Sequence, residues 1–438
     1  MFSVSAVLRS PFGCRLKACA ALLLLGFELR GDFQGSTHLV DLENGGIRYS
    51  QETSSGPIAQ LAARLRGGSA RLEWDERQGW LSALLKSLAI TQHSQLLVFS
   101  KTSLQRDFIY PNNPRALYFN DTSYVGFIPG APLIELSEVD SRLGAVFFTL
   151  NQTKSDHPVL KRVDSCLECH ATARTLGVPG HLIRSLETDT QGVVNLATGI
   201  DPIDDRTPFA ERWGGWYVSG QYGKMEHRGN RMGSDSFPAK LTLSLGGDRS
   251  SLGSSVLMDN YPSGGSDIVA LMVFQHQVRL HNFITRLHYM AVQNLEAYHH
   301  IEYLKSPIES LVKALLFSGE APLPAPIRGD PAFTAAFQAV GLRDRYGHSL
   351  RELDLERRLF RLPCSFLIHS AAFGALPPPL KKRIYERIKT ILDAQESPEA
   401  FHHLSSLDRS ALREMLSDTL PDLPEGWGQK PVTRSKSE

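Results

Sequence analysis

The sequence predicts an α+β fold, in which an antiparallel sheet region is followed by a mainly α-helical C-terminal domain. Two observations lead to this prediction. Short apolar runs rich in β-branched and aromatic residues occur between 95 and 152, which is typical of strands. From 266 to 306 the chain has neither Gly nor Pro, and its apolar residues recur densely, as expected for one long helix or two collinear ones.

The other elements follow from periodicity and from turn residues. Short amphipathic helices are predicted where leucines recur at helical spacing, at 57–65 and 79–88. About five strands are then separated by Pro, Asn, Asp and Gly, at 96–99, 116–119, 124–128, 133–136 and 145–150. Beyond the long helical segment, the clearest helices are at 354–359, 379–392 and 406–416.

The composition is that of folded domains, and no charge excess points to nucleic acid or to anionic lipid as a partner. The chain is 42% hydrophobic and 21% charged, and its 47 basic residues nearly balance 46 acidic ones, so we expect no nucleic acid partner.

The stretch Cys166-Leu167-Glu168-Cys169-His170 has the C-x-x-C-H spacing that attaches a c-type haem. Its two thiols can form thioethers to one porphyrin, and the following imidazole can ligate the iron. We therefore predict one covalent haem c, with Cys166 and Cys169 as anchors and His170 as proximal ligand. A zinc site would need further paired ligands, and Cys364 is the only other cysteine beyond the N-terminal segment. A thioredoxin-like dithiol would leave His170 unexplained.

The N-terminal segment has the composition of an export signal, which haem c attachment outside the cytoplasm requires. Arg9, Arg15 and Lys17 precede a short apolar core at 18–25, too short to span a bilayer. We predict an exported, periplasmic protein. No clear cleavage site follows the core, so retention as an N-terminal membrane tether is left open.

A chain of 438 residues is longer than a single hydrophobic core usually stabilises, so several domains are expected. The predicted organisation is a signal peptide or anchor at 1–33, a sheet-containing haem-binding domain at 45–235, a Gly- and Ser-rich linker at 236–265, a helical domain at 266–428 and a disordered tail at 429–438.

The residue on the opposite side of the iron would decide between electron carriage and catalysis. His227 lies in a polar, glycine-flanked stretch and is our first candidate for the sixth ligand, a metal-binding role shared with His170. Met225, Met232, His281 and His276 are alternatives. His181 and His157 are expected at the surface.

The string Arg212-Trp213-Gly214-Gly215-Trp216 has two interpretations. Trp213 and Trp216 could form an apolar wall for the porphyrin, with Arg212 and Arg228 pairing its propionates. The same string could instead form a tight turn between core strands.

The chain resembles a family of exported bacterial monohaem c-type cytochrome-like proteins, each with a single C-x-x-C-H site. The resemblance is carried by Leu97–Gln105, Arg115–Asp121, Cys166–His170, Glu211–Val218 and the His227-x-Gly229-Asn230 element. It implies haem binding and electron transfer. Gln221-Tyr222-Gly223 departs from the family pattern, which carries a His before the glycine, and this leaves His227 as the better ligand candidate.

These observations together predict electron transfer through one haem c, with a redox protein or a small-molecule donor or acceptor as partner. One alternative is a haem enzyme with an open sixth site that acts on peroxide or another small oxidant. Another is a haem-based sensor or interaction protein.

Overall fold

The computed structural model describes residues 39–198, 201–233, 248–249, 252 and 256–427. The predicted export segment at 1–33 and the tail at 429–438 lie outside these residues, as does much of the predicted linker at 236–265. No helix within the described ranges is long and apolar enough to cross a membrane.

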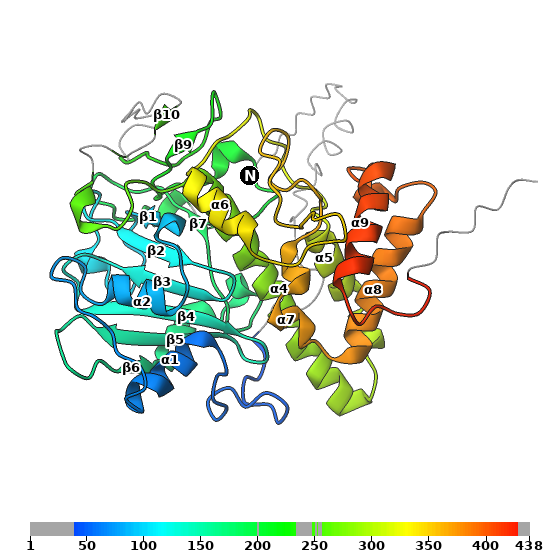
Figure 1. The fold of residues 1–438 in the computed structure, drawn as a ribbon, viewed down its shortest axis with the longest axis horizontal. Helices are drawn as coiled ribbons and strands as arrows, with labels where there is room; N and C mark the ends of the chain where they lie inside the picture. The colour runs from blue at the N-terminus through cyan, green and yellow to red at the C-terminus, as the bar shows by residue number, and fades with distance from the viewer. Residues whose placement is uncertain (1–38, 199–200, 234–247, 250–251, 253–255, 428–438) are drawn as a thin grey trace, which may run out of the picture. The chain divides into compact units, whose positions relative to one another are not determined.

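The central element is a six-stranded antiparallel sheet in which every strand pairs with its neighbour in the sequence (Figure 1). Its strands are β1 (Leu96–Val98), β2 (Arg115–Phe119), β3 (Ser123–Phe127), β4 (Leu133–Asp140), β5 (Gly144–Asn151) and β6 (Leu160–Arg162). The α+β class and the five predicted strands are confirmed. The sixth strand, β6, was missed because it has three residues, two of which are charged.

Period-2 alternation divides the side chains of the sheet between two cores. One face, which includes Tyr118, Val125 and Phe148, packs with α1 (Pro57–Arg66) and α2 (Leu81–Ser87). The opposite face, which includes Phe119 and Tyr124, packs against α4 (Ile268–Tyr298). The sheet is therefore covered by helices on both faces.

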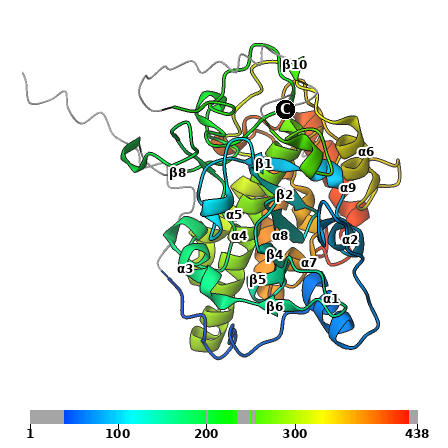
Figure 2. The same ribbon diagram turned by 90° about the vertical axis from the view of Figure 1, so that its left-hand side faces the viewer.

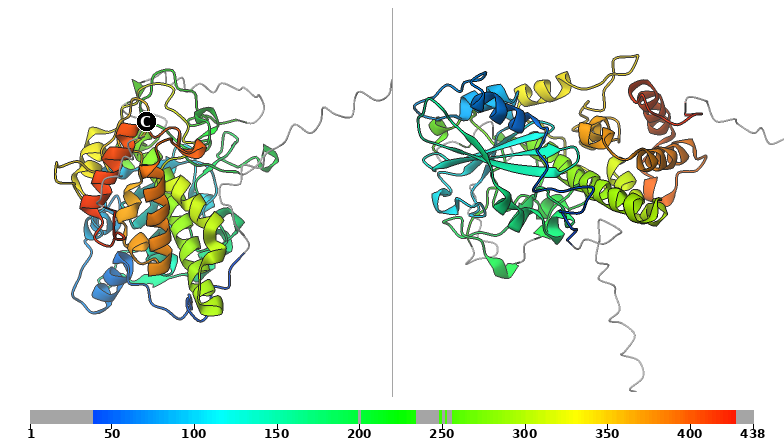
Figure 3. Two further views of the ribbon diagram at one scale, coloured as in Figure 1. Left: turned by 90° about the vertical axis from the view of Figure 1, so that its right-hand side faces the viewer. Right: turned by 90° about the horizontal axis from the view of Figure 1, so that it is seen from below.

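Helix α4 is buried on every side from Ile268 to Tyr289. Its buried polar side chains, such as His276, Gln277 and Asn282, therefore form hydrogen bonds inside the protein. It begins at the Asp267 cap, whose carboxylate accepts from Ala270 N, and it ends at His299, which has a left-handed φ of 61°. Figure 3 shows α4 running from the sheet to the C-terminal helices.

Further helices follow α4: α5 (Lys305–Leu315), α6 (Pro331–Ala339), α7 (Ala371–Gly374), α8 (Pro378–Asp393) and α9 (Ser406–Thr419). The predicted helix at 354–359 is wrong. The Asp354 carboxylate accepts from the backbone N–H groups of Glu356 and Arg357, and Leu355 has a φ of 59°, so this stretch forms a turn.

The predicted sheet-containing and helical domains share a hydrophobic core. Phe119 of β2 packs against Phe274 of α4 and Phe333 of α6. Helix α4 therefore packs against both the sheet and the later helices.

Candidate functional site

The C-x-x-C-H residues occupy one helical turn directly after the sheet. Following β6, the chain forms a short 3₁₀ turn at Asp164–Cys166 and then α3 (Leu167–His170) (Figure 2). Positions three and four apart on a helix are neighbours on its surface, so Cys166 is a neighbour of both Cys169 and His170, which are adjacent in the sequence. Both thiols are free, with Cys166 half-buried and Cys169 exposed.

The backbone of Gly180 holds His170 in one tautomer. His170 Nδ1 lies 2.9 Å from the carbonyl oxygen of Gly180, while Gly180 N–H donates to the carbonyl of His170 at 2.8 Å. Because a carbonyl only accepts, Nδ1 must carry the proton. Burial lowers the pKa of His170, so the ring is neutral and the lone pair of Nε2 is available to a metal.

Two charged side chains of the sheet act electrostatically on Cys166. Arg115 on β2 pairs with Glu135 on β4 at 2.6 Å, and both are half-buried. Burial and the Glu135 carboxylate raise the pKa of Cys166 to about 11, and Arg115 acts in the opposite direction. Burial and the nearby Arg174 lower the pKa of Arg184, whereas Cys169 raises it. Arg115 and Arg184 are thus the half-buried cations that act on the two thiols.

The expectation that His181 is a surface residue is wrong. Its side chain is buried, its ring lies 4.3 Å from Tyr124 and 6.3 Å from His170 between centroids, and its Nε2 is 2.7 Å from Ser137 Oγ. Its Nδ1 has no hydrogen-bond partner. The residue was missed because nothing in its local sequence shows that α4 and the sheet close over it.

Arg212 lies away from the role predicted for it. Its buried guanidinium donates to the carbonyls of Thr207 and Asp205 and lies over the Phe209 ring. These contacts stabilise the protein's own loop, which corrects the expectation that Arg212 is free to pair a propionate. Arg228, its predicted companion, donates through its backbone N–H to the carbonyl of Arg212.

The two tryptophans of the same string have different hydrogen-bond partners, and only one of them binds Arg184. Trp213 is fully buried and donates to Gln275 on α4. Trp216 donates to the carbonyl of Arg184 and forms a bridge with Val98 at the sheet edge. Of the two, Trp216 is therefore the one that binds Arg184, whose charge interacts with Cys169. The alternative interpretation, a turn between core strands, fits Trp213.

The predicted sixth ligand, His227, is buried beside Trp213 and Tyr222, with ring centroids at 5.5 and 4.9 Å. Burial and the nearby Arg231 lower its pKa to about 4. The aromatic rings that contact His170 are those of Phe147 and His181, and His227 contacts other rings. Met225 and Met232 are buried in separate hydrophobic cores.

The alternative ligands on α4 already have partners. His281 Nδ1 lies 3.1 Å from the Tyr124 hydroxyl, and burial lowers the pKa of His281 to about 3. His276 uses both ring nitrogens, at 2.9 Å from an Asp205 carboxylate oxygen and 2.7 Å from Ser365 Oγ.

Asp205, His276 and Ser365 have the hydrogen-bond order of a serine nucleophile triad. His276 and Ser365 are fully enclosed and Asp205 is 5% exposed. The His276 ring stacks on Phe317 at 4.4 Å, and Arg279 also binds Asp205 at 3.0 Å. Because a nucleophile must touch its substrate, we assign this array a structural role.

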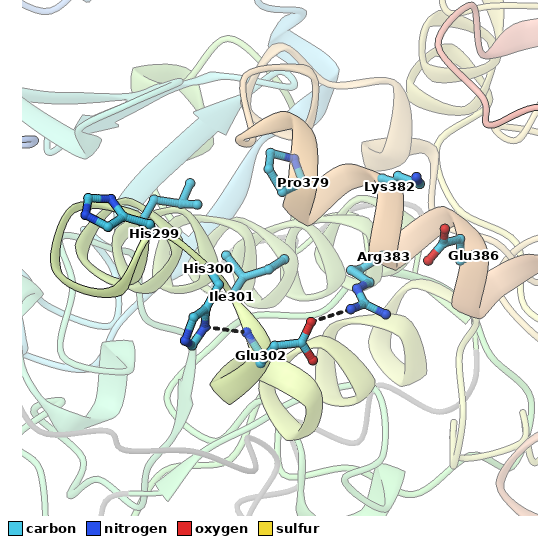
Figure 4. A pocket seen from close by; sticks show the side chains of 9 residues that line it. His299, His300, Ile301, Glu302, Pro379, Lys382, Arg383 and Glu386 are labelled. Carbon is cyan, nitrogen blue, oxygen red and sulfur yellow. Dashed lines mark hydrogen bonds and ion pairs between the residues drawn. The ribbon is translucent and has the colours of Figure 1, made fainter.

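A separate hollow of about 450 Å³ lies where α4 ends and α8 begins (Figure 4). His299, His300, Lys382, Arg383 and the carboxylates of Glu302 and Glu386 line it. Glu302 binds Arg383, and its backbone N–H donates to His300 Nδ1. Charges of both signs face this hollow, so its composition selects no class of ligand.

The C-x-x-C-H turn places a neutral imidazole and two free thiols within one helical turn. Within the described ranges, no group of three or more His, Cys, Asp or Glu side chains could hold a metal ion by itself. A haem needs no such group, because its four pyrrole nitrogens occupy the equatorial positions and the protein supplies axial ligands. Comparisons with protein-family models, curated proteins and solved structures found no match for this chain, so its assignment rests on its own residues.

Proposed function

We propose that this protein carries one haem c, attached through Cys166 and Cys169 and ligated by His170, and that it transfers electrons. One observation carries the proposal. The bond from His170 Nδ1 to the Gly180 carbonyl leaves Nε2 free beside two unpaired thiols on the same helical turn. Ligating histidines commonly donate their other ring N–H in this way, which fixes the tautomer and raises ligand basicity.

The surrounding residues have distinct roles in this proposal. Phe147 and His181 pack against the imidazole, with ring centroids at 4.8 and 6.3 Å. Arg115 and Arg184 replace Arg212 as the cations that would pair with propionates. A bound haem would supply one-electron chemistry, and a single haem limits the protein to one-electron steps or to a relay between partners.

The proposal also requires export, because haem c is attached outside the cytoplasm. Export and a redox partner, either a protein or a small molecule, therefore belong to the same proposal as the haem. The segment at 1–33 would supply the signal.

The decisive experiment expresses the full chain together with a cytochrome maturation system. We expect haem that survives denaturing electrophoresis and an absorption spectrum typical of haem c. The Cys166→Ala/Cys169→Ala variant should lose covalent haem, whereas Cys364→Ala, which removes a buried thiol elsewhere, should retain it. A wild-type protein that matures without covalent haem would refute the proposal.

The sixth position decides between a carrier and the alternative of an open-site enzyme. His227 packs between Trp213 and Tyr222, so we expect His227→Ala to leave the haem spectrum unchanged. Carbon monoxide added to the reduced protein reports the same position directly. A spectrum that stays unchanged supports a closed electron carrier, and prompt binding supports a haem enzyme that acts on a small oxidant.

A further inference from the structure

Asn282 of α4 binds the backbone of His181, the residue that follows the glycine holding His170. Asn282, which is buried, binds both backbone groups of His181: its Oδ1 accepts from His181 N–H at 3.1 Å, and its Nδ2 donates to the His181 carbonyl at 2.8 Å. An amide that uses both its donor and its acceptor on one residue fixes that backbone as a neighbouring strand would.

The residue before His181 is Gly180, which makes two bonds to His170. A Cβ at position 180 would lie 2.2 Å from Asn282 Oδ1, so glycine is required for the amide to approach this closely. The peptide between Gly180 and His181 is thus held by His170 on one side and by Asn282 on the other.

The His181 side chain strengthens the same connection. Its ring bonds Ser137 on β4 and lies 4.3 Å from the ring of Tyr124 on β3, whose hydroxyl in turn bonds His281 on α4. Asn282 and His281 are adjacent on α4, so this one turn of the helix fixes both the backbone and the ring environment of His181.

We propose that Asn282 is a positioning residue that sets the hydrogen bond between His170 Nδ1 and the Gly180 carbonyl, and thereby tunes the iron bound at His170. The haem part of this inference rests on the proposed function. A well-aligned Nδ1–H···O bond makes the imidazole a stronger donor, which favours the oxidised iron. Loss of the Asn282 amide therefore shifts the equilibrium towards the reduced form.

The test compares Asn282→Ala with Asn294→Ala in the full-length holoprotein. Asn294 is the same residue type on the same helix, but it donates only to the Met290 carbonyl of its own helix. We expect Asn282→Ala to favour reduction about tenfold, equivalent to about 59 mV for one electron, and Asn294→Ala to leave the potential unchanged. Equal potentials in the two variants would overturn the proposal.

A second readout separates this inference from the haem proposal. In the haem-free protein, the ¹⁵N chemical shifts of His170 report its tautomer. Wild-type protein should hold the proton on Nδ1, and Asn282→Ala should give a mixture of tautomers. Asn282→Asp keeps the acceptor for His181 N–H but loses the donor, so it should give an intermediate result and replaces the alanine variant if that variant does not fold. Unaltered tautomers in both variants would reject the role of Asn282 whether or not the wild type binds haem.

Discussion

The guanidinium of Arg115 lies across the backbone of β3 to reach Glu135 on β4, and the 2.6 Å ion pair between them passes over Gly126. A methyl group at position 126 would lie 2.7 Å from Arg115 Nη2 and 2.9 Å from Nε. The glycine is therefore what allows a charged pair to cross the sheet beside Cys166.

Gly126→Ala should lower the free energy of unfolding of the wild type but not that of the Arg115→Ala variant. In the wild type, we expect Gly126→Ala to displace Arg115 and lower the free energy of unfolding by about 1 kcal/mol, because a half-buried charged hydrogen bond outweighs the gain in strand propensity. In Arg115→Ala, the same change should be neutral or stabilising. Urea denaturation of the wild type, the two single variants and the double variant gives this double-mutant cycle. Gly264→Ala, where the added methyl group has open space, is the control. An effect of the same sign in both backgrounds would contradict this account of Gly126.

The two thiols of the haem-free protein should react at different rates. At pH 8 the thiolate of Cys166 is scarce because its pKa is about 11, whereas Cys169 is exposed. We expect iodoacetamide to modify Cys169 first, and modification of Cys166 to accelerate as the pH rises towards 11. Glu135→Gln should lower the pKa of Cys166 and speed its alkylation, as followed by peptide mass spectrometry. Glu168→Gln, next to Cys169, should leave Cys166 unchanged, and equal rates in the two variants would argue against the role of Glu135.

Glu320 should make stability depend on pH. Burial and the Asp205 carboxylate raise its pKa to about 8, while Arg212 and Arg358 act in the opposite direction. Between the ordinary value of 4.5 and about 8, the folded protein keeps a proton that the unfolded chain has lost. The contribution of this residue to stability therefore falls as the pH rises through that window, by up to about 1.4 kcal/mol per pH unit.

The measurement is the free energy of unfolding from pH 5 to pH 9 for wild type and Glu320→Gln. The difference between the two proteins should change across the window and level off above pH 8. Glu399→Gln, which alters an exposed carboxylate, should follow the wild type at every pH. Parallel curves for wild type and Glu320→Gln would exclude the predicted titration.

Ser365 should matter for stability and not for catalysis. Ser365→Ala leaves His276 Nε2 without its 2.7 Å partner among aromatic rings, which should cost about 1–3 kcal/mol in unfolding experiments. Ser417→Ala, which removes a hydroxyl bonded to a carbonyl of its own helix, should cost less. A fluorophosphonate should not label the native protein, because Ser365 is fully buried. Labelling at Ser365 would show instead that the Asp205–His276–Ser365 array is an accessible nucleophile.

Local sequence patterns determined the elements of this fold that repeat over several residues. Short apolar runs between turn residues located β1 to β5, helical spacing of leucines located α1 and α2, and a long run without Gly or Pro located α4. The spacing of Cys166, Cys169 and His170 determined that they lie within a single helical turn, because that relationship is local. The predicted helix at 354–359 failed because side-chain bonds from Asp354 outweighed its periodicity.

Tertiary structure alone decided which distant residues meet at that turn. Asn282 reaches the backbone of His181 across about a hundred residues of sequence, whereas Gly180 binds His170 from ten residues away. Burial of His181 depends on a helix that begins almost ninety residues later. The same packing directs Arg212 to its own loop carbonyls and brings Arg115 to Cys166. Hydrogen bonds and burial depend on distances in space, and no local periodicity encodes them.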